Sequence, residues 1–191
     1  DDLAAAAAVA PADGWILGQR VVYLGEAGRW GDAREEAARC GQVSPWWCRA
    51  LEGLALHRLG RYEAAEAAFL EALALMPVEE RARWLDVEPL LGPDGVDARR
   101  EALRRFESAG EGGQGGVAPD APAWPRPVEA GWWRLADPLF LVEGNDRLTE
   151  HWARHVVART REGARNPYAT SWGWDLAELM VRYGIEVGGA R

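Results

Sequence analysis

Residues 46–77, WWCRALEGLALHRLGRYEAAEAAFLEALALMP, predict two helices folded back on each other. The first helix is expected over residues 45–59 and the second over residues 62–76, with Gly60 in the turn and Pro77 after the end. On the second helix, apolar residues recur at the spacing of one buried face. The residues expected to face the partner helix are Leu51, Gly53 and Leu54 on the first, and Ala65, Ala68, Phe69, Ala72 and Leu75 on the second.

The sizes of these side chains matter as much as their spacing. Gly53 and Ala65 would let the two helix backbones approach closely, Phe69 would fill the space beside them, and Ala72 leaves room for a further helix. Together with Pro77, these positions resemble the small, small, large, small and proline signature of the tetratricopeptide (TPR) repeat. The resemblance implies a stack of helical hairpins, because one such unit cannot bury its apolar face alone.

A weaker copy of the same pattern precedes this stretch, over residues 13–41. Its centre is Gly28-Arg29-Trp30, which aligns with Gly60-Arg61-Tyr62. Asp13 is expected to cap its first helix. The alignment pairs Trp15 with Trp47, Ala33 with Ala65 and Ala37 with Phe69, but places Val21 opposite Gly53 and Cys40 opposite Ala72. Such departures are typical of a terminal repeat, which lacks a neighbour on one side.

The first helix of each TPR unit lines the inner face of the stack, where an apolar groove would suit a partner helix or an extended peptide. We therefore predict protein partners. An alternative is that the C-terminal half of this chain fills the same surface. The predicted groove consists of Trp15, Val22, Trp47, Ala50, Leu54, His57 and Arg58.

Composition excludes some classes of protein. Of the 191 residues, 48% are apolar, which argues against general disorder. The net charge of −8 argues against a nucleic-acid partner, which requires a basic face. No stretch of apolar residues is long enough to span a membrane. Eleven Trp residues are many for this length, and we expect several at helix seams or at a subunit interface.

The chain opens on DDLAAAAAVAP without a Met, which suggests a processed or excised product, with a removed signal peptide as one explanation. Cys40 and Cys48 flank a short turn between two predicted helices. That spacing allows a disulfide, and two buried free thiols are the alternative.

The rest of the N-terminal half is expected to be helical. A helix after Pro77 ends or kinks at Pro89 and covers the end of the repeat stack. A further helix over residues 96–108 carries a solvated face of Arg99, Arg100, Arg104 and Arg105. Residues 108–131 are rich in Gly, Pro and Ala and predict a linker or long loop. The expected domains are a TPR-like unit over residues 1–107 and a Trp-rich module over residues 132–191.

In that module, Trp132 and Trp133 precede an extended piece over residues 138–142. Asn145 is expected to cap a helix that ends near Gly163. Its buried face is predicted to be Leu148, Trp152, His155 and Val156. Residues 176–183 form either a short helix or a strand.

This half resembles the GWxTD-motif domain of bacterial proteins, which are often exported and often carry TPR repeats. In this chain Asp175 directly follows Trp174, so the two positions between Trp and Asp in that signature are missing. The resemblance implies an extracytoplasmic location, in the periplasm or at the cell surface, and no catalytic chemistry. It is carried by Trp133, Asp137, Pro138, Asn145, Arg147, Leu148, Glu150, Arg154, Gly173, Trp174, Asp175, Arg182, Tyr183 and Gly184.

His151 and His155 are separated by one helical turn and could reach one metal ion. HWARH lacks the Glu of HExxH, so it is no zinc-peptidase motif. The helical wheel instead predicts a packed His155 beside a solvated His151 at the edge of the buried face. Glu150 and Arg154 are expected to form an ion pair on one helix face. No catalytic residue and no cofactor is predicted.

The sequence thus predicts a mainly α protein in which a short stack of TPR-like hairpins precedes a mostly helical module with little strand. The expected function is a non-catalytic scaffold or accessory subunit of a bacterial extracytoplasmic complex. One alternative is a structural subunit of a larger membrane-associated assembly. The other is a metal-dependent enzyme module that uses His151 and His155.

Overall fold

The computed structural model describes residues 2–40, 42–110, 127–162 and 174–184, and over these ranges the protein is mainly α with no strand. The helices are α1 (Asp2–Val9), α2 (Gly14–Glu26), α3 (Trp30–Ala38), α4 (Pro45–Arg58), α5 (Tyr62–Leu75), α6 (Val78–Leu85), the 3-10 helix η1 (Glu88–Leu90), α7 (Pro93–Gly110), α8 (Pro127–Ala136), α9 (Asp146–Thr160) and α10 (Trp174–Tyr183).

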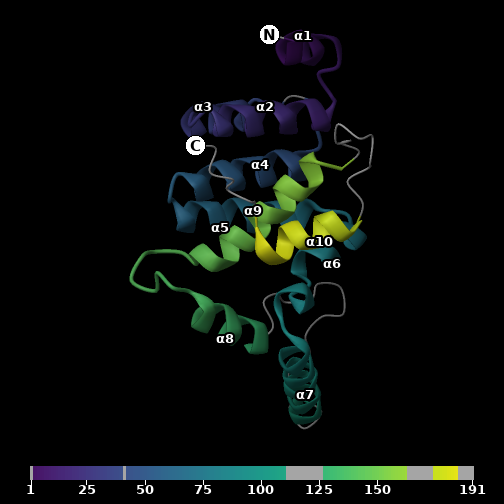
Figure 1. Cartoon of the computed structure of the whole chain (residues 1–191), viewed down its shortest axis with the longest axis vertical. Coiled ribbons are helices and arrows are strands. Elements are labelled where there is room, and N and C mark those ends of the chain that lie inside the picture. The colour runs from purple at the N-terminus through teal and green to yellow at the C-terminus, as the bar shows by residue number, and fades with distance from the viewer. Residues whose placement is uncertain (1, 41, 111–126, 163–173, 185–191) are drawn as a thin grey trace.

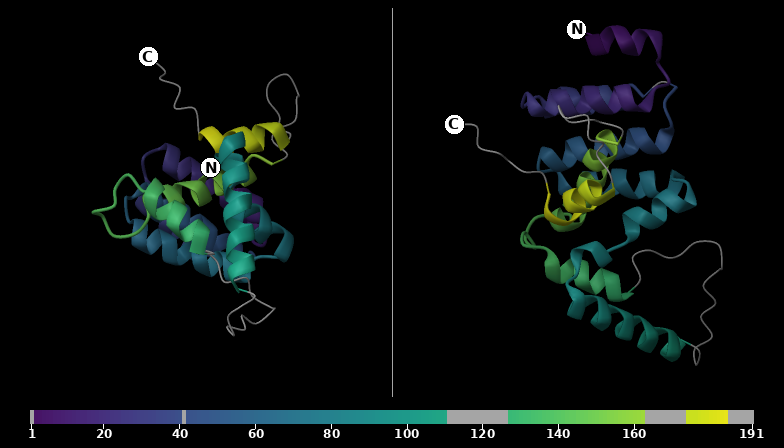
Figure 2. Two further views of the ribbon diagram at one scale, coloured as in Figure 1. Left: turned by 90° about the horizontal axis from the view of Figure 1, so that it is seen from below. Right: turned by 45° about the vertical axis from the view of Figure 1, so that its right-hand side comes forward.

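Two helical hairpins, α2–α3 and α4–α5, form the upper body of the molecule, with α1 above them (Figure 1). The hairpins stack through contacts of α4 with both α2 and α3. Helix α9 packs against α2, α4 and α5, and α10 lies against α9 and η1. Helices α7 and α8 lie at the opposite end from α1, as the right-hand view of Figure 2 shows.

Both hairpins turn in the same way because both contain a Gly-Arg-aromatic sequence. After α4, the Gly60 N–H donates to the carbonyl of His57 at 2.9 Å and the Arg61 N–H donates to that of Leu56 at 3.0 Å. This pair of bonds is the Schellman motif, which requires a left-handed residue, and Gly60 has φ +71°. The same two bonds recur around Gly28, at φ +74°.

The predicted close approach of α4 and α5 occurs at Gly53. A Cβ placed on this glycine would lie 2.8 Å from two ring atoms of Phe69, so the absence of a side chain admits the ring. Phe69, Ala65 and Ala72 are fully buried, and Pro77 stands immediately before α6. The small residues therefore leave space that the large Phe69 ring fills, as their sizes predict.

The predicted helix starts at Asp13 and Asn145 also match. The Asp13 carboxylate accepts hydrogen bonds from the N–H groups of Trp15, at 2.8 Å, and Ile16, at 3.1 Å. The Asn145 side chain accepts one from the N–H of Leu148, at 2.8 Å. Each cap satisfies N–H groups that the first helical turn leaves unpaired.

Three local expectations were wrong. Residues 138–142, expected to be extended, form turns and a bend. Leu75, expected on the buried face of the second helix, is the last residue of α5 and is 56% exposed. Arg99 does not lie on a solvated face, because its guanidinium donates to buried Glu129 at 2.8 Å and so joins α7 to α8. Residues 176–183, expected to form either a short helix or a strand, lie in helix α10.

The predicted linker falls mostly outside the described residues. Helix α7 continues to Gly110, and the chain is described again from Pro127, where α8 begins. Within the described residues, no helix combines the length and apolar character needed to cross a membrane.

Candidate interaction surfaces

The chain's own helix α9 lies across the face where a peptide groove was predicted. Its Trp152 is fully buried, with its ring centroid 5.5 Å from that of Phe69 on α5. Beneath α9, Ala50 and Leu54 of α4 have no exposed surface. The alternative in which the C-terminal half fills this face therefore describes the structure. A partner could reach these residues only if α9 moved away.

The other predicted groove residues have separate environments. Trp47 is buried, and its indole N–H donates to the carbonyl of Gly14 at 2.8 Å. Arg58 is exposed, and its guanidinium lies 5.8 Å from the Trp30 ring centroid. Val22 is half-buried, and Trp15 is 51% exposed. The seven residues thus do not form one open surface.

The seventh predicted groove residue, His57, binds α9 directly. Its Nδ1 lies 2.9 Å from Thr149 Oγ1 and its Nε2 lies 2.6 Å from Glu150. The predicted pair of Glu150 with Arg154 is present, at 2.9 Å. Burial raises the pKa of Glu150, but hydrogen bonds from His57 and Arg154 outweigh burial and lower this pKa to about 2. Glu150 is therefore ionised at neutral pH and ties α4 to α9.

Several residues that carry the GWxTD-like resemblance hold helices together. The Asn145 amide donates to the carbonyl of Trp133, at 2.7 Å, which joins α9 to α8. Arg154 donates to the carbonyls of Val181 and Arg182 at the end of α10. In this fold these side chains have structural partners. Gly173 and the side chain of Trp174 lie outside what the structure describes.

The prediction of a solvated His151 was wrong. His151 is 2% exposed, and its Nε2 lies 3.2 Å from the carbonyl of Trp84, to which it donates as the neutral tautomer. Its ring is 4.8 Å from that of His155, which stacks on Trp84 at 5.4 Å. The helical wheel of α9 could not show that Trp84 of α6 and Trp133 of α8 close over this edge.

Burial lowers the pKa of His151 to about 4 and that of His155 well below its usual value. Both rings are therefore neutral at pH 7. Among the described residues, no cluster of three or more His, Cys, Asp or Glu side chains could hold a metal ion. The two histidines have no third ligand there.

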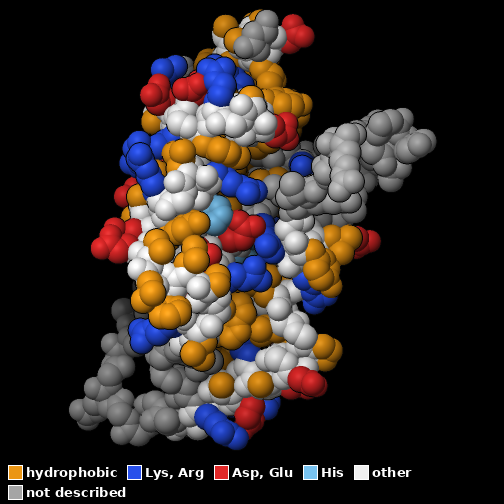
Figure 3. Space-filling model, turned by 60° about the vertical axis from the view of Figure 1, so that its left-hand side comes forward, with side chains coloured by type: hydrophobic (Ala, Val, Ile, Leu, Met, Phe, Trp, Pro, Cys, Tyr) orange, Lys and Arg blue, Asp and Glu red, His pale blue; other side chains and the backbone are white. Residues whose placement is uncertain are grey.

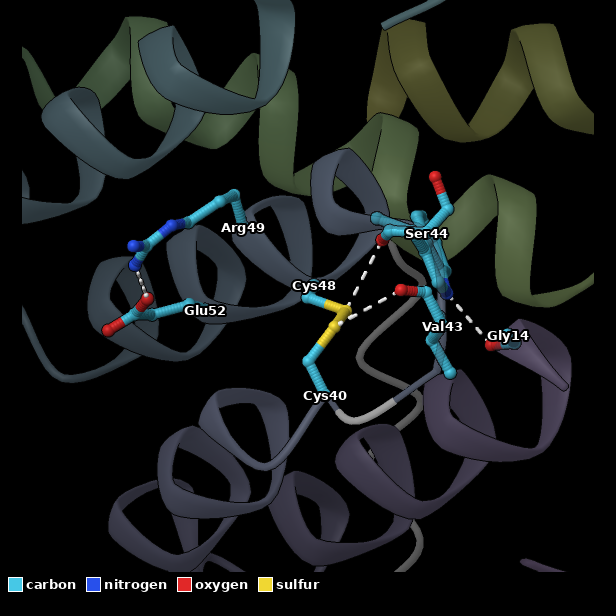
Figure 4. The surroundings of a disulfide bond; sticks show 8 residues. Gly14, Cys40, Val43, Ser44, Cys48, Arg49 and Glu52 are labelled. Atoms are coloured by element: carbon cyan, nitrogen blue, oxygen red, sulfur yellow. Dashed lines mark hydrogen bonds and ion pairs between the residues drawn. A yellow bond between two sulfur atoms is a disulfide. The ribbon is translucent and has the colours of Figure 1, made fainter. Parts of the chain in front are cut away.

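Cys40 and Cys48 form a disulfide in the structure, with Cα atoms 5.7 Å apart (Figure 4). The bond joins the residue two positions after α3 to the first turn of α4. Cys48 Sγ also lies 3.3 Å from the carbonyl oxygen of Ser44. The disulfide thus fixes the turn that places Trp46 and Trp47 at the start of α4.

A group of exposed apolar side chains lies at the end of α8 and in the turns that follow it. We call it the apolar loop, and it comprises Leu135 and residues 139–142. Figure 3, in which the left-hand side of Figure 1 comes forward, shows hydrophobic side chains exposed on this face of the molecule. Their exposed fractions are 89% for Leu135, 41% for Leu139, 74% for Phe140, 88% for Leu141 and 47% for Val142.

Both ends of residues 139–142 of the apolar loop are fixed. Before it, the Asp137 carboxylate accepts from the N–H of Leu139 at 3.0 Å. After it, Gly144 packs its backbone against that of Tyr62 and Glu63 at the start of α5, with φ +85°. The loop therefore presents its apolar side chains from a defined backbone, and exposed apolar side chains that gather in one place mark an interaction site.

Replacing Gly144 by Ala tests this anchor. A Cβ at Gly144 would overlap the backbone of Glu63, and the left-handed φ is unfavourable for any residue with a Cβ. We expect the free energy of unfolding to fall by about 2–4 kcal/mol, measured by urea denaturation. Gly131→Ala is the matched control, because no atom lies within 4 Å of a Cβ there. Inside α8 it should stabilise by about 0.5–1 kcal/mol. Equal effects of the two would contradict the anchoring.

Comparison of the chain with protein-family models, with curated proteins and with solved structures gives no match to any of them.

Proposed function

We propose that this protein is a non-catalytic scaffold or accessory subunit of a bacterial extracytoplasmic complex, and that a partner protein docks on the apolar loop. The observation that supports docking is the exposure of Leu135, Phe140 and Leu141 on a backbone anchored at both ends. The TPR-like and GWxTD-like resemblances support the class of protein.

The physical argument rests on the unfavourable hydration of these side chains. Each large apolar side chain left in water forgoes about 1.5–3 kcal/mol that burial would contribute. Leu141 and Phe140 lie next to each other at a turn closed by the Val142 N–H, which donates to the carbonyl of Leu139 at 2.7 Å. Adjacent apolar side chains on a convex turn fit an apolar pocket on a partner, where buried anchors supply most of the binding energy.

The extracytoplasmic location has its own support. A disulfide such as Cys40–Cys48 persists in oxidising compartments and is rare in reducing ones. The acidic net charge of −8 agrees with a protein rather than a nucleic-acid partner. The buried, carbonyl-bound His151 gives no support to the alternative of a metal-dependent enzyme.

Leu141→Asp is expected to weaken partner binding strongly without unfolding the protein. Leu141 is 88% exposed, so the change should alter the free energy of unfolding by less than about 0.5 kcal/mol. Buried in an interface, the new carboxylate would be desolvated and should weaken binding at least about tenfold. The measurement is capture of the partner from source-cell extract by a photo-crosslinker placed at Phe140, quantified with and without Leu141→Asp.

Leu75→Asp is the matched control. Leu75 is 56% exposed at the far end of α5, about 20 Å along the helix from the Gly144 contact. It introduces the same charge on a different part of the surface and should leave capture unchanged. A partner retained by Leu141→Asp, or lost equally with both variants, would contradict docking on the apolar loop.

A further inference from the structure

A cavity of about 370 Å³ lies at the other end of α9, and it goes beyond the proposed docking site. It opens where the starts of α2 and α4 meet the end of α9. Its volume lies in the lower part of the range of small-molecule pockets. The residues that the argument uses are Trp15, Ser44, Trp46, Trp47, Arg159 and Glu162.

Arg159 gives the cavity its charge. Its guanidinium lies 4.8 Å from the Trp46 ring centroid and 5.3 Å from that of Trp47, so the two indoles hold it by cation–π attraction. Its described ion pairs, with Glu80 at 3.1 Å and Glu162 at 4.0 Å, both use Nη1. A ligand would therefore meet the remaining edge of the guanidinium fork.

The neighbouring groups favour an anion over a cation. Glu80 is shared, because Arg83 lies 3.4 Å from its other oxygen, so Glu80 does not neutralise Arg159 alone. Ser44 precedes α4 but makes no capping bond with its hydroxyl, which can donate to a ligand. Among the described residues that line the cavity, the one acid is Glu162, whose side chain is about half exposed and lies 4.0 Å from Arg159. A cationic ligand would compete with Arg159 for the same indole faces.

Trp15 supplies an apolar wall. It is 51% exposed, whereas Trp46 and Trp47 are buried at 8% and 5%. A flat apolar group placed against Trp15 would cover indole surface that water now contacts. Gly14 lets the start of α2 pack closely on Trp47, since a Cβ there would lie 3.1 Å from the Trp47 ring.

We propose that this cavity binds a carboxylate attached to a flat apolar group, with the carboxylate on Arg159 and Ser44 and the apolar group against Trp15. A free aromatic acid and the C-terminal residue of a peptide share this chemistry. Forked pairing of a guanidinium with a carboxylate fits the donor set, because two parallel N–H groups match two oxygens.

Phenylacetate, its neutral analogue phenylacetamide and the peptide acid N-acetyl-Gly-Phe are the probes. Binding to the full chain is followed by the indole N–H signals in ¹H–¹⁵N NMR spectra, with the Trp15 signal assigned by its loss in Trp15→Ala. At about 10 mM probe we expect saturable shifts of the Trp15 signal with both acids and none with the amide. Tighter binding of the peptide acid would identify a chain terminus as the natural ligand, and tighter binding of phenylacetate a free acid.

The variants are chosen so that loss of folding does not imitate loss of binding. Trp15→Ala removes a half-exposed side chain, and Arg159→Lys keeps the charge but not the fork. Each should weaken binding of the acids by about tenfold, with an unchanged circular dichroism spectrum. In Trp15→Ala, which lacks the Trp15 signal, binding is read from the indole signals of Trp46 and Trp47. Leu141→Asp lies at the opposite end of α9 and should bind the acids normally, so this test is independent of the proposed function. No shift of Trp15 with either acid, or equal shifts with acid and amide, would overturn the proposal.

Discussion

Trp152→Ala is expected to lower the free energy of unfolding by about 3–5 kcal/mol, as large aromatic truncations in cores do. Trp152 has no exposed surface and packs on Phe69, which in turn occupies the space left by Gly53. The truncation would leave a cavity at the contact between α9 and the α4–α5 hairpin. Because α9 also contacts α2 and α10, the loss should be felt in one cooperative transition.

Urea denaturation followed by circular dichroism measures the effect, and Trp15→Ala serves as the matched control. Trp15 is 51% exposed, so the same chemical change there should lower the unfolding free energy by less than about 1 kcal/mol. A Trp152→Ala protein within about 1 kcal/mol of the wild type would mean that α9 is not seated on the hairpin.

Acid is expected to destabilise the protein through His151 and His155. In the folded chain the pKa of His151 is about 4, against about 6.5 when the chain is unfolded. The unfolded state therefore binds more protons between these values, so this contribution to stability is complete above pH 6.5 and decreases as the pH falls toward 4. For His151 alone the loss at pH 5 is about 2 kcal/mol. His155, with a pKa lowered well below its usual value, acts in the same direction.

Unfolding free energies measured between pH 7 and pH 5 test this expectation. Glu150 has a pKa of about 2 in the folded chain and about 4.5 in the unfolded chain, so it also stabilises the protein less as the pH falls, but only below about pH 4.5. The histidines therefore act in a separate pH range, above that of Glu150. Arg147, Arg154 and Arg83 add repulsion to the protonated rings. The variant with both His151→Asn and His155→Asn should lose most of the decline above pH 5. An equal decline in this variant would show that other groups cause it.

The hairpin could be predicted from the sequence because its determinants are local. Gly60 ends α4 in a left-handed turn, and the spacing of Ala65, Phe69 and Ala72 on α5 identifies the buried face. The caps at Asp13 and Asn145 depend only on the next three residues. Local patterns of this kind survive in the tertiary structure because packing reinforces them.

What the sequence did not reveal depends on contacts between distant segments. The helical wheel placed His151 at an edge, but Trp84 and Trp133, from two other helices, bury it. Arg99 was assigned to solvent because its partner Glu129 lies inside the stretch expected to be a linker, which in the structure begins helix α8. Residues 138–142 were expected to be extended, yet the chain turns between Asp137 and Gly144 and leaves residues 139–142 exposed.

The seating of α9 changes how a scaffold of this kind would work. The face predicted to receive a peptide is already filled from within the chain, by Trp152 and by the bond of His57 to Thr149. The surfaces left for other molecules are then the apolar loop at the start of α9 and the cavity beside Arg159 at its end. A partner protein would bind the first, and a carboxylate the second.

The position of α9 is therefore the claim on which the rest depends, and nuclear Overhauser effects between the Trp152 indole and the Phe69 ring measure it most directly. With ring centroids 5.5 Å apart, we predict direct cross-peaks between protons of the two rings in the folded 191-residue chain. Absence of these cross-peaks, together with a Trp152 indole N–H that exchanges freely with solvent, would contradict the packing of α9 on α5. The α4–α5 face would then be open to a partner.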